Sequence, residues 1–273
     1  MPEGPEIRRS ADEIASVLVG RQIVEADFDL PAIKPFEKRV EGSTVTAVDT
    51  RGKAMLTRFD NGLVLYSHNQ LYGRWYTTTR PLLPRTRRQR RVALHTSTHS
   101  ALLYSASDIE ILDAEAEAGH PFLRRIGPDI LDANLTPATV QKRLLAPAFR
   151  NRSLGSLYLD QSFLAGNGNY LRSETLWAAG VHPQQKPSAL DDSAARRLAR
   201  QTLIIARRSY RTHGVTAPGD AVRQRRARGM RFSQYRFQVY GREGLECYAC
   251  GSDIERLSHS SRSVFVCPGC QPC

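Results

Sequence analysis

Apolar residues recur at helical spacing near the start of the chain, between residues 6 and 20. Four of them are three or four positions apart, as one face of a helix requires: Ile7, Ala11, Ile14 and Leu18. Pro5 suits the first turn of a helix, and Gly20 suits its C-terminal cap. The pattern predicts an amphipathic helix that begins only a few residues after the chain start.

Shorter apolar runs follow, with the length and composition of β-strands. They cover residues 44–48, 54–59, 63–66, 74–78, 92–96 and 101–105. Asp60-Asn61-Gly62 separates the second run from the third and is a strong hairpin signal. Because no helical pattern lies between these runs, we expect an antiparallel sandwich or barrel up to about residue 125.

The pattern becomes helical after residue 125. Thr136 is a suitable N-cap, Pro137 suits the first helical position, and apolar residues continue at helical spacing to Leu145. Further helices are predicted over residues 154–162, 170–179 and 191–208. Residues 212–230 mix Gly, Pro, Asp and Arg without periodicity, which predicts a mobile linker. The fold class is therefore α+β.

The glycine-rich residues 165–169 lead into one of these predicted helices. Exposed backbone N–H groups in such a turn, at the N-terminus of a helix, can bind a phosphate. The alternative is a tight loop between two helices that binds nothing.

The chain of 273 residues carries a formal net charge of +12, and its pI is near 9.9. This charge favours an acidic polymer as partner, because Lys and Arg that neutralise phosphates release condensed counterions. The densest arginine runs lie within residues 85–91 and 223–236. Any single run can be a solvated surface loop, but together the runs favour nucleic acid.

The hydrophobic content of 41% is enough for two or three compact units. No run of about 18 apolar residues exists, and the chain start is charged and amphipathic. We therefore expect a protein that is neither secreted nor membrane-spanning and that is located in the cytoplasm.

Four of the five cysteines have the spacing of a four-thiolate zinc site: Cys247-x2-Cys250-x16-Cys267-x2-Cys270. Disulfides are the alternative, but thiols stay reduced in the intracellular setting that the rest of the chain indicates. We expect one structural zinc ion, because four protein ligands leave no open coordination position. Cys273 lies outside this set and is expected to be a free thiol.

The segment that connects the two cysteine pairs includes residues 258–263, which we expect to form an exposed tip that projects Arg262. An arginine held there can bind a phosphate through a paired hydrogen-bond fork. A plain solvated turn is the alternative.

Pro2 is a candidate nucleophile. Initiator methionine is usually removed before a small residue, so the Met1-Pro2 start predicts a mature chain that begins with the secondary amine of proline. Terminal amines have reference pKa values of about 7.7 to 8.0, so a fraction is unprotonated at neutral pH. Attack of this amine on a sugar C1′ would give an iminium ion, which acidifies the adjacent carbon and promotes strand cleavage by elimination.

Such chemistry needs a carboxyl group and a cation close to the amine. Glu3 is adjacent in sequence, and Glu6 lies one helical turn further on. Lys53, between two predicted strands, is a candidate for the cation, although a lysine in this setting can also be an ordinary solvated side chain.

Taken together, these motifs resemble the formamidopyrimidine-DNA glycosylase and endonuclease VIII superfamily. The matching stretches span nearly the whole chain: Pro2-Glu3-Gly4-Pro5-Glu6, Arg51-Gly52-Lys53-Ala54, Tyr66-Ser67-His68-Asn69-Gln70-Leu71-Tyr72-Gly73, Leu159-Asp160-Gln161, Gly166-x-Gly168-Asn169-Tyr170 and the four cysteines. The Glu-Gly-Pro-Glu start and the contiguous Gln70-Leu71-Tyr72 resemble the bacterial endonuclease VIII branch more than the formamidopyrimidine branch.

The resemblance implies three domains: a β-sandwich with an N-terminal helix over residues 1–125, a helix-two-turn-helix domain over 126–235 and a zinc ribbon over 236–273. It also implies a bifunctional DNA glycosylase and abasic-site lyase of base excision repair. Such an enzyme would excise oxidised pyrimidines from damaged double-stranded DNA and cleave the abasic site by β,δ-elimination.

The resemblance further implies a role for each matched residue. Pro2 would be the Schiff-base nucleophile and Glu3 the proton donor in base excision. Lys53 and Arg262 would be the proton donors linked to β- and δ-elimination. The DNA-contacting positions would be Gln70, Leu71, Tyr72, Arg125 and Asn169, the first three filling the gap left when the damaged base is flipped out. Glu6 is a secondary candidate for the active site.

Two other functions stay open from the sequence. One is a formamidopyrimidine-type glycosylase for oxidised purines, which would share the catalytic residues. The other is a non-catalytic zinc-ribbon protein that only binds DNA. Residues 212–230 match no family pattern, so they leave the preferred lesion open.

Two expectations concern the form of the protein. A retained Met1 would convert the Pro2 nitrogen into a tertiary amide without nucleophilicity, so we hypothesise that the active form lacks Met1. We also expect a monomer, because the pattern contains no apolar assembly surface.

Overall fold

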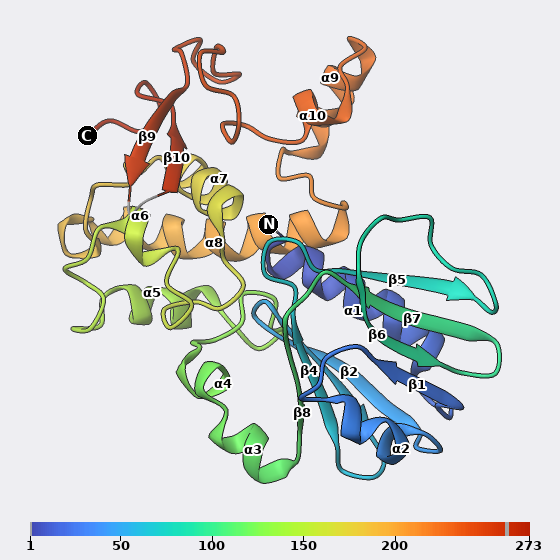
Figure 1. Cartoon of the computed structure of the whole chain (residues 1–273). Helices are drawn as coiled ribbons and strands as arrows, with labels where there is room; N and C mark the ends of the chain where they lie inside the picture. Colours follow the sequence, from blue (N-terminus) through green and yellow to red (C-terminus); the bar gives the residue numbers. More distant parts are fainter. Residues whose placement is uncertain (1, 260–261) are drawn as a thin grey trace. The chain divides into compact units, whose positions relative to one another are not determined.

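The computed structural model describes residues 2–259 and 262–273 (Figure 1). The chain divides into two compact units, Met1–Pro2 with Glu6–Arg125 and Glu3–Pro5 with Ile126–Cys273. Each unit is described by itself. The second unit includes both the helical segment and the cysteine segment, whose separation into two domains at residue 236 stays a prediction.

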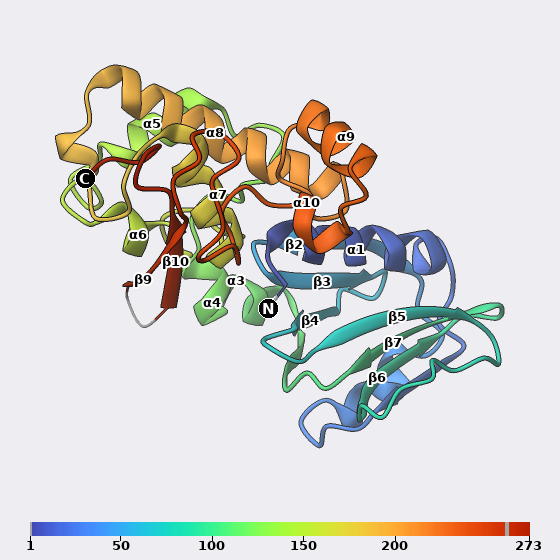
Figure 2. The same cartoon turned by 90° about the horizontal axis from the view of Figure 1, so that it is seen from above.

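The first unit contains two antiparallel four-stranded sheets, which confirms the sandwich (Figures 1 and 2). One sheet has the order β1-β6-β7-β5, with strands Glu25–Phe28, Arg90–His95, His99–Tyr104 and Arg74–Thr79. The other has the order β2-β3-β4-β8, with strands Val45–Arg51, Ala54–Phe59, Val64–His68 and Asp108–Leu112. The apolar runs thus predict six of the eight strands, and β1 and β8 are the ones they miss.

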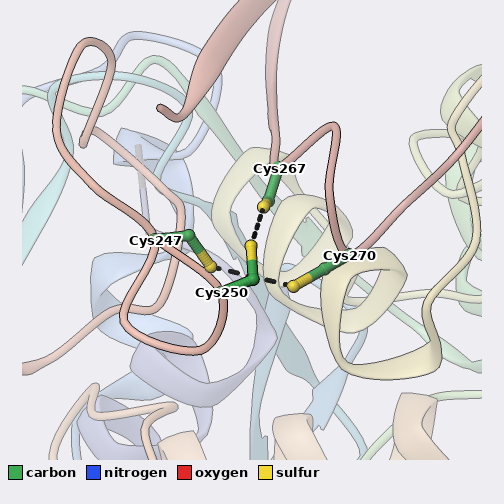
Figure 3. Close-up of side chains that lie close together, drawn as sticks. All are labelled: Cys247, Cys250, Cys267 and Cys270. Carbon is green, nitrogen blue, oxygen red and sulfur yellow. Dashed lines mark hydrogen bonds between the residues drawn. The ribbon is translucent and has the colours of Figure 1, made fainter. Parts of the chain in front are cut away.

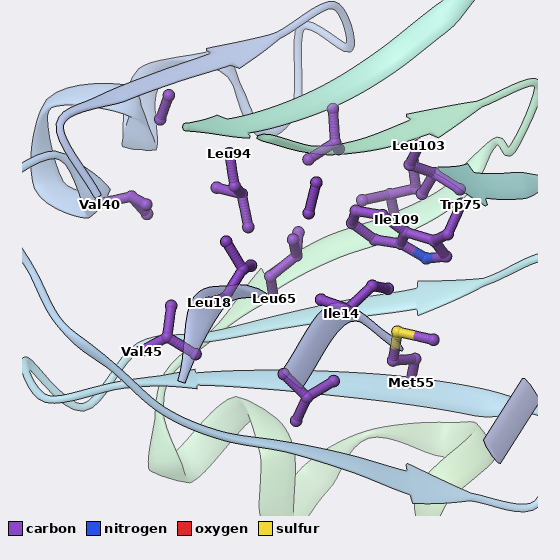
Figure 4. Packing of buried hydrophobic residues seen from close by; sticks show 14 of the residues in the cluster. Ile14, Leu18, Val40, Val45, Met55, Leu65, Trp75, Leu94, Leu103 and Ile109 are labelled. Carbon is purple, nitrogen blue, oxygen red and sulfur yellow. The ribbon is translucent and has the colours of Figure 1, made fainter. Parts of the chain in front are cut away.

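Helix α1 (Gly4–Leu18) closes the core of this unit. Its apolar face contributes Ile14 and Leu18 to a buried cluster that contains side chains from both sheets, among them Met55, Leu65 and Leu94 (Figure 4). The 3₁₀ helix η1 (Lys34–Phe36) and α2 (Glu37–Val40) follow β1, and Val40 is buried in the same cluster. The predicted N-terminal helix is confirmed, and its burial follows from the three-to-four spacing of its apolar residues.

The outer face of the second sheet is also covered. Helices α3 (Ala114–Gly119) and α4 (Pro121–Arg125) follow β8, and Phe122 and Leu123 of α4 pack against Leu56 and Tyr66. A strand that is covered on both faces needs apolar residues at successive positions, which explains the nearly continuous apolar run of β3. The hairpin at Asp60-Asn61-Gly62 is confirmed, with Gly62 at φ 82°.

The second unit is built around α8 (Asp192–Arg211), against which α5 (Pro137–Leu144) and α7 (Asn169–Ala179) pack. The short helices are α6 (Leu154–Leu157), η2 (Pro187–Ala189), α9 (Gly219–Ala227) and α10 (Phe232–Tyr235). The antiparallel hairpin of β9 (Glu255–His259) and β10 (Arg262–Val266) packs on α7 through β10 (Figure 2). Among the described residues, no helix has the length and apolar composition needed to cross a membrane.

Two predictions for the secondary structure of the second unit are wrong. The helix predicted over 154–162 ends at Leu157, because the Asp160 carboxylate accepts the Ser162 N–H at 2.8 Å and pairs with Arg152 at 2.6 Å, which turns the chain. The predicted mobile linker contains α9, where the buried Arg225 donates to Gln238 Oε1 at 2.7 Å. Partners distant in sequence decide both cases.

Candidate active site

Glu3 is fixed to the start of α7. Its Oε1 accepts the backbone N–H of Tyr170 at 2.8 Å, and its Oε2 accepts that of Leu171 at 3.2 Å. The side chain is only 4% exposed. The helix N-terminus predicted to bind a phosphate therefore binds a carboxylate of this same chain.

The glycine-rich segment before α7 fits closely around Glu3. The Gly4 N–H donates to Gly166 O at 2.8 Å, and Gly166 has a φ of +95°, which favours glycine. A Cβ on Gly168 would lie 2.6 Å from Glu3 Cγ and closer still to the carboxyl group. The prediction that residues 165–169 expose their backbone is wrong, because residues 165–168 are buried.

Pro2 is half-buried and directly precedes this fixed carboxylate. The Met1 question lies outside the described residues. Glu6 lies in the first turn of α1 and forms a salt bridge with Arg9 at 3.0 Å, so it is engaged on its own helix.

Asn169 and the strand that starts with Arg262 are joined by a residue that sequence reasoning missed. The fully buried Arg172 donates to Asn169 Oδ1 at 2.5 Å and to Ser263 O at 2.9 Å. Burial lowers the pKa of Arg172 to about 10, an effect that Glu3 opposes and Arg262 reinforces. Arg262 itself is exposed at the first position of β10.

Glu174 is a second missed residue on the same helix. Its buried carboxylate accepts the Val239 N–H at 2.8 Å, the Tyr240 N–H at 2.9 Å and the Thr216 hydroxyl. The sequence signal for both residues is weak, since Arg172 and Glu174 lie in a polar run, Arg-Ser-Glu-Thr, between the apolar residues Leu171 and Leu176. Such charged residues are buried only when they are paired.

Lys53 lies in the first unit, in the two-residue turn between β2 and β3. The pair Arg51 and Ala54 closes this turn, and Gly52 has a φ of 64°. Lys53 is only 9% exposed, so it is not an ordinary solvated lysine. Burial lowers the pKa of the nearby His68. Asp108 opposes this effect, whereas Lys53 adds to it. The His68 imidazole is therefore neutral at pH 7.

The segment Gln70-Leu71-Tyr72 forms an exposed tip between β4 and β5. Leu71 is 57% exposed and Tyr72 is 69% exposed. The base of the tip is held by hydrogen bonds: Gln70 N–H donates to His68 Nδ1 at 3.2 Å, and the Ser107 hydroxyl donates to Gln70 Oε1 at 2.9 Å. Arg88 also donates to the Tyr72 carbonyl. An apolar and aromatic tip on a fixed base suits insertion into a stack of bases.

Arg125 is exposed at the end of α4, and its Nε donates to Pro121 O at 3.0 Å. The remaining predicted residues fall into two sets. Glu3, Asn169 and Arg262 are connected around Arg172 in the second unit, and Lys53 and the Gln70-Leu71-Tyr72 tip are neighbours of His68 in the first.

The four predicted cysteines converge (Figure 3). All their sulfurs lie within 4.8 Å of one another, with Cys247 and Cys270 at 3.8 Å and Cys250 and Cys267 at 3.3 Å. A tetrahedral zinc ion with Zn–S distances of about 2.3 Å separates its sulfurs by about 3.8 Å. The residues therefore fit a metal ion, and Cys273 lies outside the cluster as predicted.

Comparisons with known proteins identify the family of this chain. The Formamidopyrimidine-DNA glycosylase N-terminal domain matches residues 1–107, and the Formamidopyrimidine-DNA glycosylase H2TH domain matches residues 126–218. Proteins named Endonuclease 8 from Salmonella arizonae and Salmonella typhimurium strain LT2 are each 48% identical over 271 residues, covering 99% of this chain and all of theirs.

Solved structures share the fold. Lactococcus lactis Fpg in complex with DNA containing an abasic site has a TM-score of 0.80 at 21% identity, covering 99% of this chain and 100% of that one. The same protein with DNA containing an oxidised pyrimidine has a TM-score of 0.81 at 22% identity, covering 100% of both chains. The chain therefore belongs to the formamidopyrimidine-DNA glycosylase and endonuclease VIII superfamily and is a DNA glycosylase with abasic-site lyase activity, an enzyme of base excision repair.

Proposed function

We propose that this enzyme excises oxidised pyrimidines from double-stranded DNA and cleaves the strand by β,δ-elimination through a Schiff base on Pro2. The observation that carries the proposal is the fixed position of Glu3. Its carboxylate is held by two N–H groups of α7, and Glu3 directly follows Pro2 in the sequence. A buried, anchored neighbour restrains the proline nitrogen, which is what nucleophilic attack at one sugar carbon requires.

The amine of Pro2 would attack C1′ of the damaged nucleotide. The N–C1′ bond forms as the bond to the base breaks, and the base leaves as an anion that takes a proton from solvent. Opening of the sugar ring gives an iminium ion, which withdraws electrons from C2′. Loss of a C2′ proton then breaks the C3′–O bond, and a second elimination breaks the C5′–O bond.

Glu3 would transfer the protons that excision requires. Two backbone N–H donors at a helix N-terminus favour the ionised, acceptor-only carboxylate. Glu3 would therefore first accept a proton and then return it as the sugar ring opens, which is general acid–base catalysis by one group.

Lys53 and Arg262 would serve the two eliminations. The burial of Lys53 supports this role, because an ammonium group on a buried side chain is screened less by water and interacts strongly with a phosphate leaving group. Arg262 is exposed, and its strand is held to α7 by the Arg172 bond to Ser263 O. Asn169 and Arg125 would contact the DNA backbone.

The lesion class rests on the exposed tip and on the relatives. Gln70-Leu71-Tyr72 is one continuous wedge, as in the endonuclease VIII pattern, and the 48% identical relatives are named Endonuclease 8. The cysteine cluster would hold one structural zinc ion, which organises the segment that presents Arg262. We also propose a monomer that acts in the bacterial cytoplasm, since these relatives are bacterial.

A formamidopyrimidine-type glycosylase for oxidised purines is the second candidate. The matched family models carry the formamidopyrimidine name, and one solved relative is bound to FAPY-dG-containing DNA. Family membership supports an enzyme over a non-catalytic DNA-binding protein.

Borohydride trapping tests the mechanism. With a duplex that contains thymine glycol, we expect a covalent adduct for the protein with a free Pro2, and none for Pro2→Gly or for a form that retains Met1. Glu3→Gln should lose roughly 10²- to 10⁴-fold in base excision while still cleaving a preformed abasic site. An adduct mapped by mass spectrometry to a lysine would contradict the proposal.

Substrate comparison tests the lesion class. We expect faster single-turnover excision of thymine glycol than of 8-oxoguanine opposite cytosine. The reverse order would support the purine-specific alternative and leave the Pro2 mechanism intact.

A further inference from the structure

Residues 219–236 form a basic structural module that lies beyond the last residue matched by the family models. We call it the arginine module. It contains α9 and α10, drawn in orange in Figure 1, and it has six arginines and one acidic residue, Asp220. The catalytic proposal uses none of these residues.

The arginine module is attached to the cysteine cluster through the ring of Tyr248, which follows Cys247. The guanidinium carbons of Arg225 and Arg242 each lie 3.5 Å from the Tyr248 ring centroid. Two guanidinium groups at this distance from one centroid must occupy opposite faces of the ring. Cation–π contacts are strongest when the cation is desolvated, and both arginines are nine-tenths or more buried.

Hydrogen bonds complete this attachment. The Gln238 side-chain oxygen accepts a hydrogen bond from Arg225 at 2.7 Å. The Gln238 backbone carbonyl accepts one from Arg242 at 2.5 Å. The Tyr248 hydroxyl donates to the backbone carbonyl of Gln234 in α10 at 3.0 Å. The module is therefore held to one face of Tyr248 by Arg225, and Arg242, which lies beyond the module, covers the other face.

Three of the remaining arginines face outward, whereas Arg236 is half-buried and donates to Gly214 O at 3.1 Å. Arg226, Arg228 and Arg231 are exposed and form no salt bridge within residues 2–259 and 262–273, whereas Arg223 pairs with Asp220. Three exposed guanidinium groups without a salt bridge on one short segment form a basic surface that a polyanion can contact. In a DNA repair enzyme the available polyanion is the phosphate backbone of duplex DNA, which arginine binds through paired hydrogen bonds.

We propose that the arginine module binds the phosphate backbone of duplex DNA, and that Tyr248 is a positioning residue that holds the module against the cysteine cluster. This surface adds affinity without reading the damaged base. The inference rests on membership of a DNA repair family and is independent of the proposed lesion class and of the Pro2 mechanism.

The salt dependence of binding tests the surface. The triple variant R226Q/R228Q/R231Q is compared with R21Q/R39Q/R200Q, which removes three other exposed arginines that form no salt bridge in the described part of the chain. Two duplexes are used, one undamaged and one with an uncleavable tetrahydrofuran abasic analogue.

We expect the module variant to reduce the slope of log K against log salt by about 2 to 3, since each phosphate contact contributes about 0.9. Affinity should fall about ten- to hundredfold by the same factor on both duplexes, and the control variant should change the slope by less than about 1. A loss confined to the abasic duplex, or an equal loss in the control, would overturn the proposal.

A double-mutant cycle tests Tyr248. Tyr248→Leu should weaken DNA binding in the otherwise native protein and have no further effect in the R226Q/R228Q/R231Q background, because it acts only through those arginines. Tyr248→Phe keeps the ring and should retain most of the affinity. Additive losses from Tyr248→Leu and the triple variant would show that Tyr248 does not position the module.

Metal content is measured for each variant, because Tyr248 follows a cysteine of the cluster. If Tyr248→Leu loses the metal, Arg225→Gln replaces Tyr248→Leu in the same cycle. This variant removes the guanidinium group from one face of the Tyr248 ring, and Arg225 is not next to a cysteine in sequence. Increased tryptic cleavage within residues 219–236 is expected for either variant. Unchanged cleavage together with unchanged affinity would contradict the positioning role.

Discussion

The carboxylate of Glu3 takes the place of a helix cap. Gly168, at the N-cap position of α7, has no side chain to satisfy the first N–H groups, and Glu3 supplies two acceptors from the other end of the sequence. N-terminal N–H groups of a helix that lack a partner are costly when buried. One side chain thus stabilises a helix start and fixes the residue next to the proposed nucleophile.

Gly168→Ala should show whether base excision depends on the position of Glu3 when the protein remains folded. The backbone of Gly168 is extended, with a φ of −150°, so alanine is compatible with it, but the added Cβ would overlap the Glu3 carboxyl group. We expect base excision to fall about 100-fold or more, in line with the displacement of a general acid–base group. Single-turnover kinetics on a thymine glycol duplex measures the loss.

Gly119→Ala is the matched control, because in the described part of the chain no atom outside its own helix backbone and its chain neighbours lies within 4 Å of its new Cβ. It should excise at the native rate. Native excision by Gly168→Ala would mean that the fixed position of Glu3 is not required.

At the scale of elements, α3 is attached to β3 by one ion pair. Arg58 donates to both carboxylate oxygens of Glu117, at 2.7 and 2.9 Å, and also to Asp49. The hydrogen bond from Arg58 holds the pKa of Glu117 below its ordinary value, with burial opposing. A bidentate pair of this kind restrains α3 at the sheet surface.

Glu117→Gln should destabilise the first unit by about 1 kcal/mol at pH 7, the upper end of the range for partly exposed pairs. Because the folded pKa is depressed, the stabilisation is present above the unfolded pKa of about 4.3 and is lost as pH falls through the folded value. Urea unfolding followed by Trp75 fluorescence in a Trp177→Phe background would show a difference at pH 7 that decreases as the pH falls below about 4.

Glu115→Gln on the same helix serves as the control, because Glu115 is exposed and forms no salt bridge among the described residues. Its effect should be small at both pH values. A pH-independent loss for Glu117→Gln would point to packing instead of the ion pair.

At the scale of the whole molecule, the cysteine cluster organises the end of the chain. Cys247 and Cys267 pack with Val239 and Ile254 in a small core of few apolar residues, which a bound metal ion would stabilise. The segments that hold Arg262 and Tyr248 both start from this core.

Cys250→Ser should reduce the zinc content from one ion per chain to nearly none and weaken DNA binding at least about tenfold, because a bound structural metal contributes directly to folding. Elemental analysis and a binding titration on the abasic-analogue duplex measure the two effects. Cys273→Ser, outside the cluster, should change neither. Full zinc content in Cys250→Ser would contradict the four-cysteine site.

Local chemistry made several features predictable. The predicted strand over 54–59 is β3, Thr136 and Pro137 start α5, and the spacing of the cysteines predicts their cluster. Period, capping and ligand spacing are properties of neighbouring residues, so no knowledge of the fold is needed.

Other features depended on partners far along the chain. The exposed loop predicted at residues 165–169 is buried because Glu3 packs into it, and the predicted linker contains a helix because Arg225 stacks on Tyr248. Buried charges such as Arg172 and Glu174 are hard to recognise in sequence, since their partners lie in β10 and in residues 216–240.

The sequence by itself determined the family, the sandwich, the helical second part and the residues expected to react, because these follow from periodicity and from motifs that are contiguous or regularly spaced. Only the tertiary structure decided how those residues are held. It shows which carboxylate caps α7, which lysine is buried and which arginines are buried or exposed. The physical reason is that burial and hydrogen bonding depend on through-space neighbours, and these neighbours are tens to hundreds of residues away along the chain.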